Sequence, residues 1–418
     1  MVPMSEPRVR FADTLPATAD VVVIGGGVVG CATAFFAARA GLRVLVLERH
    51  AALGTLTTAA STGAFRLQFD NQEEIATVRE GVELFDDFAA RTGLDGWDLG
   101  LRHGGYLFCS LTDATVERSR RLVERQRTWG LTDVELLDGD AARERWPWLA
   151  PEVRGARYRA GDGWLDAKRL TVGYATAASN PDRIPGAAAG GGATFATRAG
   201  VTEIVLDGDH VSGVRTTRGD VATGTVIIAV GPFAARVAAL AGVEVVLRPT
   251  RRQKLVIPEL TSVPRDAPMT IEEETSAHWR PSLNGCLALF TDPDTQASEP
   301  HDPVPVEHDW AFGLLDPSSE HALARVAPFW RHAWADGAST VHWYLQAGQY
   351  EYTPDHRPYL GAIGPGGLYL NGGYSGHGIM AGAGGSRLVV DLLTGAADPE
   401  TNPFRPDRTF EDREHDIL

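Results

Sequence analysis

The segment Val21–Glu48 constrains the fold of this chain more than any other stretch. Its first four residues, Val21–Ile24, are apolar and β-branched, and so short a run is typical of a buried parallel strand rather than of a helix. Three glycines at G-x-G-x-x-G spacing follow, then a run of small helix-forming residues, Val28–Ala40, and a second β-branched run, Val44–Leu47, before Glu48. This order predicts one βαβ unit of about 30 residues.

Each residue of the glycine motif has a physical reason for its place in this unit. Gly25 lets the chain turn off the strand, Gly27 lets the backbone approach a pyrophosphate, and Gly30 lets the helix pack against the strand. The helix begins with free N–H groups at Val28 and Val29, which suit phosphate, and Glu48 can accept hydrogen bonds from a ribose diol. The segment therefore predicts an ADP-containing dinucleotide, although the motif alone does not separate FAD from NAD.

Charge and composition exclude several other classes of protein. The formal net charge of −15 argues against nucleic acid or an anionic membrane as a partner, and no apolar run reaches the 18–20 or so residues of a membrane span. Three scattered cysteines form neither a metal pair nor a redox dithiol, which favours a reducing cytoplasm. The twelve histidines show no paired spacing with carboxylates, so we expect no metal site.

A chain of 418 residues most simply forms two domains. The β-branched run Thr225–Val230, followed by Gly231, repeats the strand and glycine turn of the amino end, and segments of this kind recur near the carboxyl end. Residues 245–290 carry several short apolar runs that predict strands of an antiparallel sheet, and Pro317–Trp334 predicts a helix. We therefore expect an α/β fold in which a Rossmann-like cofactor domain (1–70, 155–240 and 341–418) is interleaved with an α+β substrate domain (71–154 and 241–340).

Five segments, in this order along the chain, carry a family resemblance: Val21–Glu48, GAFRLQF at 63–69, IIAVGPFA at 227–234, AGQYEYTPDHRPYLG at 347–361 and GGYSGHGIM at 372–380. Together they resemble the D-amino-acid-oxidase/glycine-oxidase/sarcosine-oxidase superfamily of FAD enzymes, and within it the sarcosine/dimethylglycine branch. The TPD…SGHG signature is more specific than the glycine motif, and it favours FAD over NAD.

The resemblance implies oxidation of a C–N bond, with a hydride passed from carbon to flavin N5 and an imine as the product. It places Arg66 and His377 near the flavin as candidate catalytic residues, and Tyr350 is our candidate for a substrate-facing residue. The hydroxyl-rich loop after Glu48 can follow the cofactor. The residues expected to bind FAD are Gly25, Gly27, Val28, Val29, Gly30, Glu48, Arg49, Thr57, Thr58, Ser61, Thr62, Gly63, Val201, Ala229, Gly231, Gly348, Gly373, Gly376, His377, Gly378 and Ile379.

Several positions depart from the pattern of the family. Members of this family bind the substrate carboxylate with one of two sets of cationic residues, here called clamps. In this chain the position of one clamp holds Tyr350, and the positions of the other hold Phe69 and Met380, so neither clamp is present. Because an unpaired buried carboxylate is costly, a larger or less anionic amine is favoured unless one of three other residues supplies a cation. These are Arg252, His278 and Arg280.

The positions at which relatives attach flavin covalently hold Gly348 in one type and Thr58, Ala59 and Ala60 in the other, so we expect non-covalent FAD. The lysine that promotes oxygen reaction in sarcosine oxidase corresponds loosely to Leu289, which favours slow oxygen reaction unless Lys254 substitutes for it. An aromatic group (Trp343, Tyr344, Tyr350, Tyr352 and Tyr374) is expected around the flavin face, or as ordinary core.

Three functions stay open at this point. The first is an FAD-dependent amine oxidase or dehydrogenase acting on a small amine or N-alkyl amino acid-like substrate, with oxygen or another electron acceptor. The second is an FAD-dependent dehydrogenase of a 2-hydroxy acid or polyol. The third is a non-catalytic FAD-binding subunit of a larger complex. The sequence leaves the substrate, the acceptor and the oligomeric state open, with a homo-oligomer among the expectations.

Overall fold

A computed structural model describes residues 6–337 and 342–410 of the chain. Its first sheet has six strands in the order β18-β19-β12-β1-β2-β8. Neighbouring strands are parallel except for β18 and β19. The strands are β1 (Val21–Ile24), β2 (Arg43–Leu47), β8 (Gly192–Ala196), β12 (Val226–Ile228), β18 (Tyr359–Ala362) and β19 (Leu368–Gly372).

Strand β1 is the switch point of this sheet. It pairs with β2 on one side and with β12, which follows it by about 200 residues, on the other. The chain therefore leaves the carboxyl ends of these three parallel strands in different directions, and a crevice opens there. The predicted βαβ unit is confirmed, with helix α1 (Val28–Arg39) between β1 and β2.

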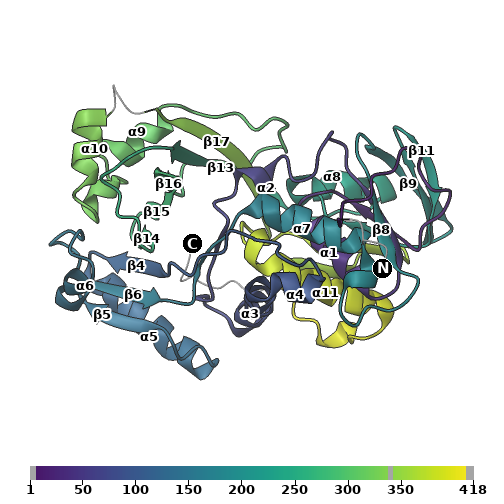
Figure 1. Ribbon diagram of the computed structural model, residues 1–418, viewed down its shortest axis with the longest axis horizontal. Coiled ribbons are helices and arrows are strands. Elements are labelled where there is room, and N and C mark those ends of the chain that lie inside the picture. The colour runs from purple at the N-terminus through teal and green to yellow at the C-terminus, as the bar shows by residue number, and fades with distance from the viewer. Residues whose placement is uncertain (1–5, 338–341, 411–418) are drawn as a thin grey trace.

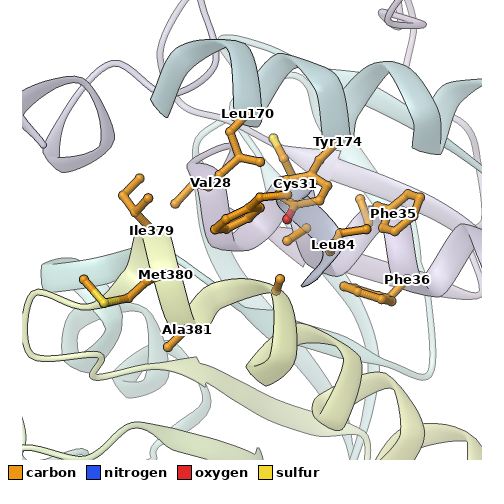
Figure 2. Packing of buried hydrophobic residues seen from close by; sticks show 14 of the residues in the cluster. Val28, Cys31, Phe35, Phe36, Leu84, Leu170, Tyr174, Ile379, Met380 and Ala381 are labelled. Atoms are coloured by element: carbon orange, nitrogen blue, oxygen red, sulfur yellow. The ribbon is translucent and has the colours of Figure 1, made fainter. Parts of the chain in front are cut away.

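Helix α1 is buried on nearly every side because helices cover it as well as the sheet. It packs against α7 (Ala167–Ser179) and α11 (Gly378–Thr394), and α11 packs in turn on α3 (Gln72–Asp86). Figure 2 shows Leu170 and Tyr174 of α7 on one side of α1 and Met380 of α11 on the other. A helix that is apolar all round, as α1 is, needs such a position in the core of a large domain.

The other face of the first sheet is covered by a three-stranded antiparallel sheet, in the order β11-β10-β9, and by helix α8 (Ala234–Ala238). The three strands are β9 (Val201–Asp207), β10 (His210–Thr216) and β11 (Gly219–Ala222). Short 3-10 turns flank α8 at Gly231–Phe233 and Ala239–Ala241, and Val221, Val226 and Ala238 belong to one apolar cluster.

The second sheet has eight strands in the order β17-β13-β16-β15-β14-β4-β6-β5. It is antiparallel, as expected, except that β14 and β4 run parallel. With its helices it forms the left side of Figure 1, and the first sheet lies on the right. The strands are β4 (Tyr106–Ser110), β5 (Glu135–Asp138), β6 (Gly155–Arg159), β13 (Arg248–Ile257), β14 (Met269–Glu272), β15 (His278–Ser282), β16 (Gly285–Leu289) and β17 (Tyr344–Tyr352).

Two strands of this sheet correct the expected distribution of segments. Both β6 and β17 lie in ranges that we assigned to the cofactor domain, yet both are hydrogen-bonded into the eight-stranded sheet. Strand β17 pairs along its whole length with β13, from Tyr344 opposite Val256 to Tyr352 opposite Arg248. This pairing makes β17 an edge strand of the larger sheet, although the TPD segment follows it directly in the sequence.

The outward face of the second sheet carries a separate core of tryptophans and small apolar residues beneath α9 (Trp310–Leu315) and α10 (Trp330–Gly337). The predicted helix 317–334 is wrong. Asp316 is extended before Pro317, so α9 ends at Leu315, and the chain then forms only a 3-10 turn (Leu323–Arg325) before Pro328. The remaining elements are α2 (Thr57–Ala60), α4 (Phe88–Thr92), α5 (Asp113–Thr128), α6 (Gly139–Arg145), β3 (Ala64–Phe65), β7 (Gly163–Trp164) and the 3-10 turns Pro181–Arg183 and Pro399–Thr401.

Among the described helices, none combines the length and the apolar character that crossing a bilayer requires.

Candidate functional site

A cavity of about 410 Å³ opens at the carboxyl ends of β1, β2 and β12 and continues to strands β13 and β17 of the larger sheet. It brings together residues that are more than 300 positions apart. Most of the predicted site residues line it: Gly25, Gly27, Val28, Val29, Glu48, Arg49, Thr57, Thr58, Ser61, Thr62, Val201, Ala229, Gly231, Gly348, Tyr350, Gly376, Gly378 and Ile379.

The β1–α1 turn has the close packing that its glycines predict. A Cβ atom on Gly30 would lie 1.9 Å from the carbonyl oxygen of Gly25, so only glycine fits there. Gly27 is different, because a Cβ atom there would meet nothing nearer than Thr58 Oγ1 at 3.4 Å, an ordinary contact distance. Within the chain, therefore, Gly30 is required for packing, whereas the bare backbone of Gly27 leaves room for a ligand.

The first backbone N–H group of helix α1 has a side-chain hydrogen-bond acceptor. Thr58, on the short helix α2, accepts a hydrogen bond at Oγ1 from the backbone N–H of Val28 at 3.2 Å. Helix N-termini of this kind bind phosphate groups through the same N–H donors. Thr58 and Val28 both line the cavity, as a pyrophosphate site at this helix end would require.

Glu48 is held in place by two backbone donors. Its Oε2 atom accepts from Gly26 N–H at 2.9 Å and its Oε1 atom accepts from His50 N–H at 2.7 Å. Each carboxylate oxygen keeps a further lone pair for a second donor. Glu48 therefore keeps acceptor capacity for a ribose diol while it also fixes the turn that begins α1, and its role in binding ribose stays a prediction.

At the other end of the cavity, Tyr350 covers the glycine-rich turn before α11. A Cβ atom on Gly376 would lie 2.4 Å from the Tyr350 ring, so glycine at 376 is what allows the ring this position. Gly348 is similarly confined, since a Cβ atom there would lie 3.1 Å from the Cβ atom of Ala60. Burial raises the pKa of the Tyr350 phenol to about 12, so the hydroxyl keeps its proton at neutral pH.

Five predicted residues do not line the cavity: Gly30, Gly63, Gly373, Arg66 and His377. The imidazole of His377 instead lies 3.6 Å from Glu74 and packs edge-on against the ring of Phe69, at 4.9 Å between centroids. The guanidinium of Arg66 lies over the rings of Phe69 and Phe108. Catalytic roles for His377 and Arg66 stay predictions, and these contacts give a direct role no support.

The aromatic group is not one wall around the cavity. Of its five members only Tyr350 lines the cavity, with Tyr352 next to it at 6.1 Å between ring centroids. Trp343 packs against Phe312 on the outward side of the sheet, and Tyr344 is largely exposed. Tyr344 and Tyr350 lie on the same face of β17, so distance along the strand rather than alternation separates Tyr344 from the cavity, and Trp343 precedes the strand.

Sequence reasoning missed Glu351, a buried carboxyl group beside the cavity. Its Oε1 atom accepts a 3.4 Å hydrogen bond from Tyr374 N–H, and burial raises its pKa to about 7. The burial of Lys254 was not predicted either. Lys254 is 5% exposed, lines the cavity and donates to the carbonyl oxygen of Ser61 at 2.7 Å.

A third missed feature is the loop 298–307, which joins the two sides of the cavity entrance. Asp302 forms an ion pair with Arg49 at 2.6 Å and lies 3.0 Å from Nε2 of His50, both directly after β2. On the other side, the backbone N–H of His301 donates to Gln349 of β17, and that of Glu307 donates to Gln253 of β13. Nothing in the Pro- and Asp-rich composition of this loop indicated these partners.

The cavity therefore has a glycine turn before a helix N-terminus, an acid at the end of the next strand and a long apolar and aromatic remainder that ends at Tyr350, all at the switch point of a parallel sheet. These features define a dinucleotide-binding protein of the doubly wound class.

The sequence profile of the DAO family, described as FAD dependent oxidoreductase, matches residues 20–392. The chain belongs to this family of FAD-dependent oxidoreductases, as its sequence predicted.

Relatives and solved structures are similar to this chain over most of its length. It is 27% identical over 412 residues to the mitochondrial sarcosine dehydrogenase of Homo sapiens, a match that covers 93% of this chain and 41% of that protein. The fold resembles L-proline dehydrogenase from P. horikoshii (TM-score 0.79, 24% identity, 94% and 98% of the two chains). It also resembles glycine oxidase from Geobacillus kaustophilus (TM-score 0.78, 24% identity, 95% and 100%).

Proposed function

We propose that this protein oxidises a C–N bond of an amine or amino acid-like substrate, with hydride transfer to N5 of a non-covalently bound FAD and an imine as the product. The observation that carries the proposal is the continuity of one cavity from the β1–α1 turn to Tyr350 on the larger sheet. Membership of the FAD family and similarity to a sarcosine dehydrogenase support a substrate of this class.

When bound, FAD supplies the hydride acceptor, and the residues of the chain bind and orient the reactants. The N–H groups at the start of α1 bind the pyrophosphate, and Glu48 accepts from the ribose. The start of α11, at Gly378 and Ile379, presents further N–H donors to the same cavity, where they favour developing negative charge. Tyr350 keeps its proton and therefore acts as a hydrogen-bond donor and an aromatic surface rather than as a base.

An anaerobic titration of the yellow protein tests this function. Sarcosine, dimethylglycine, proline, glycine and D-alanine are added in turn, with lactate and glycerol 3-phosphate as the hydroxy-compound arm, and the flavin absorbance is recorded. We expect at least one amine to bleach the flavin and to yield the hydrolysis products of an imine. Bleaching by hydroxy compounds alone would overturn the proposal in favour of an alcohol dehydrogenase. Bleaching by dithionite but by no tested substrate, with activity gained only beside a partner protein, would favour a non-catalytic subunit.

A further inference from the structure

Glu351 is a buried carboxyl group that β17 places where two turns of the first sheet meet the cavity. The residue lines the cavity, and its side chain points away from the face of β17 that carries Tyr350, because neighbours in a strand face opposite sides. It lies beside Gly231, after β12, where an added Cβ atom would be 3.9 Å from Glu351 Oε2. It also lies beside Tyr374, after β19, whose N–H donates to Glu351 Oε1 at 3.4 Å. Three segments that are far apart in the sequence therefore meet at this carboxyl group.

A buried polar network fixes the turn that contains Tyr374. The Tyr374 hydroxyl donates to Asn371 Oδ1 at 2.5 Å, and Asn371 Nδ2 donates to Thr33 Oγ1 at 2.9 Å and to Ser386 Oγ at 3.0 Å. All four side chains are buried, and they join β19, α1 and α11. The surroundings of Glu351 are therefore set by rigid elements rather than by a loop that can adapt to its charge.

The carboxyl group of Glu351 has few hydrogen-bond partners within the chain. Apart from the long bond from Tyr374 and its own backbone N–H, no residue in the described ranges donates to it. Nothing except Glu351 comes within 4 Å of a Cβ atom added to Gly231, and both residues line the cavity. Its Oε2 atom is therefore available to a molecule that occupies the cavity.

The charged groups of the segments around β17 lie on the other face or are paired with other residues. On β13, Pro249 lies directly opposite Glu351, so Arg248 and Arg252 point to the other side of the sheet. Helix α2 and the turn Gly231–Phe233 hold no titratable side chain. The arginines of the neighbouring segments form ion pairs with other carboxylates: Arg251 with Glu307, Arg236 with Glu299, Arg49 with Asp302 and Arg408 with Asp355.

The remaining titratable neighbours do not stabilise a negative charge on Glu351 either. Burial raises the pKa of the phenols of Tyr350 and Tyr374, so both are uncharged at neutral pH. His377 lies 3.6 Å from Glu74, and His301, in the loop beside β17, is exposed. Among the described residues, none supplies a positive charge that favours the ionised form of Glu351, and burial raises its pKa to about 7.

A bound FAD strengthens this preference for the neutral form. The turn at Gly231 lies next to the β1–α1 turn, because a Cβ atom added to Gly25 would be 2.3 Å from the carbonyl oxygen of Ala229. A pyrophosphate held at the β1–α1 turn therefore brings negative charge near Glu351, and the cofactor also displaces water from the cavity. Both effects disfavour a carboxylate, whereas a protonated carboxyl group has an O–H that can donate to an oxygen of the cofactor.

We propose that Glu351, in its protonated form, donates a hydrogen bond to an oxygen atom in the ribityl diphosphate chain of FAD, so that binding of FAD takes up a proton from solvent. The affinity for FAD then falls as pH rises through neutrality, because the proton must be supplied before the hydrogen bond forms. The inference requires FAD in this cavity but is independent of the substrate, so it goes beyond the proposed oxidation of an amine.

The test measures the Kd for FAD as a function of pH. The full-length, FAD-loaded protein is diluted in series at pH 6, 7 and 8, and the rise of flavin fluorescence gives the Kd at each pH. Between pH 6 and pH 8 we expect the Kd of the natural protein to rise at least about threefold more than that of Glu351→Gln, whose amide donates at every pH. At pH 6 Glu351→Gln should bind FAD within about threefold of the natural protein. Glu351→Met, which has a similar volume but no donor, should bind FAD at least about fivefold more weakly at pH 6.

Two other titratable residues line the cavity, His50 and Lys254, but they are present in every variant, so the comparison with Glu351→Gln isolates the carboxyl group. Glu244→Gln is the matched control, because Glu244 is exposed, and it should keep the pH dependence of the natural protein.

The same pH dependence in the natural protein and in Glu351→Gln would overturn the inference. So would an affinity that rises with pH relative to Glu351→Gln, because the carboxylate would then accept a hydrogen bond from a ribityl hydroxyl instead. If Glu351→Gln does not fold, Glu351→Met supplies the reference for the pH dependence. Failure of every amine to reduce the flavin would refute the proposed function without affecting these results.

Discussion

Glu351 lines the cavity, and its environment differs strongly from that of an ordinary, solvent-exposed glutamate. It lies on β17, 7% exposed, next to Tyr350 in sequence and close to the backbone of Gly231 and Tyr374. No cation is among the causes of its pKa shift, which is dominated by burial. The carboxyl group therefore resists ionisation, and the protein keeps a proton at this position up to about neutral pH.

This residue makes the stability of the protein depend on pH in a direction opposite to that of most carboxyl groups. The folded-state pKa of about 7 lies above the ordinary value of 4.5, so the native state binds the proton more tightly. The contribution of this group to the free energy of unfolding is therefore unchanged below about pH 4.5, falls as pH rises toward 7, and is reduced by up to about 3 kcal/mol above that. Glu351→Gln, which mimics the protonated form, should raise the Tm relative to the natural protein more at pH 8 than at pH 5.

Thermal unfolding of FAD-loaded natural and variant proteins at pH 5, 6, 7 and 8 measures this effect. Glu244→Gln is the control, because Glu244 is exposed and its removal should shift the Tm equally at every pH. A Glu351→Gln shift that is the same at pH 5 and pH 8 would show that the carboxyl group is already ionised throughout this range.

Among individual residues of the site, the sequence predicted those whose positions are determined by local spacing. Gly25, Gly27, Glu48 and Thr58 all lie where the motif and the following loop put them, because a strand–turn–helix fixes its own geometry over a few residues. Glu351 and Lys254 were not identified as buried polar groups. Their burial depends on strand pairing between segments about 100 residues apart, which no local pattern encodes.

Among the elements, the β1–α1 turn separates two roles that glycine can have. A side chain on Gly30 would collide with the carbonyl group of Gly25, whereas a Cβ atom on Gly27, which lines the cavity, would meet only Thr58 Oγ1 at 3.4 Å. Gly30→Ala should therefore destabilise the FAD-free protein by about 1–3 kcal/mol. Gly27→Ala should leave the free energy of unfolding of that protein within about 1 kcal/mol but lower its affinity for FAD at least tenfold.

Urea unfolding of FAD-free protein and flavin absorbance per chain measure the two effects independently. The two variants serve as controls for each other, since both add one methyl group within the same turn. Full FAD retention by Gly27→Ala would mean that the pyrophosphate does not approach this backbone.

The loop 298–307 is the element that connects the nucleotide end of the cavity to the larger sheet. Asp302→Asn removes its ion pair with Arg49, which is partly exposed and therefore worth about 0.2–1 kcal/mol, and alters its contact with His50. We expect FAD to dissociate about two- to fivefold faster from this variant, as measured by the rise of flavin fluorescence on dilution.

Asp294→Asn provides the matched comparison for this loop, because Asp294 is exposed and lies in the same connection before residue 298. It should release FAD at the rate of the natural protein. Faster release from both variants would point to a general loosening of the connection rather than to the contacts of Asp302.

Elements were predicted well where periodicity is strong and poorly where proline or long-range pairing decides. Helix α1 and its strands were found within one or two residues of their bounds. The stretch 317–334 has the composition of a helix, but the residue before Pro317 is extended and Pro328 lacks a backbone donor, so α9 ends before the stretch and α10 begins only at Trp330, near its end. Strand β17 pairs with β13 along its length, which its sequence could not reveal.

For the whole molecule, the cavity joins two bodies of secondary structure that have separate cores. One core lies around α1 and the first sheet, and another lies beneath α9 and α10 on the outward face of the second sheet. Residues of both sheets and of α11 line the cavity between them. A bound FAD therefore contributes contacts to both bodies, and its binding free energy adds to the stability of the folded chain.

The attachment of that FAD can be predicted from the side chains around it. Cys31, Cys109 and Cys286 are buried and none lines the cavity, and the positions 58–60 and 348 hold no cysteine or histidine. His50 lines the cavity but is engaged by Asp302. We therefore expect acid precipitation to leave the protein pellet colourless and to release all of the flavin into the supernatant. A yellow pellet would mean a covalent bond to one of the lining residues.

The same non-covalent binding has a thermodynamic consequence for the whole molecule. A ligand that is held only by the folded chain stabilises it by about 2.7 kcal/mol at one hundred times its Kd. Because the cavity is lined by both sheets, FAD-free protein should lose several degrees of Tm and both bodies should become more open to proteolysis together. Added FAD should restore the Tm and the protection in proportion to the logarithm of its concentration. Cleavage confined to the first sheet and its helices would show that the larger sheet contributes little to holding the cofactor.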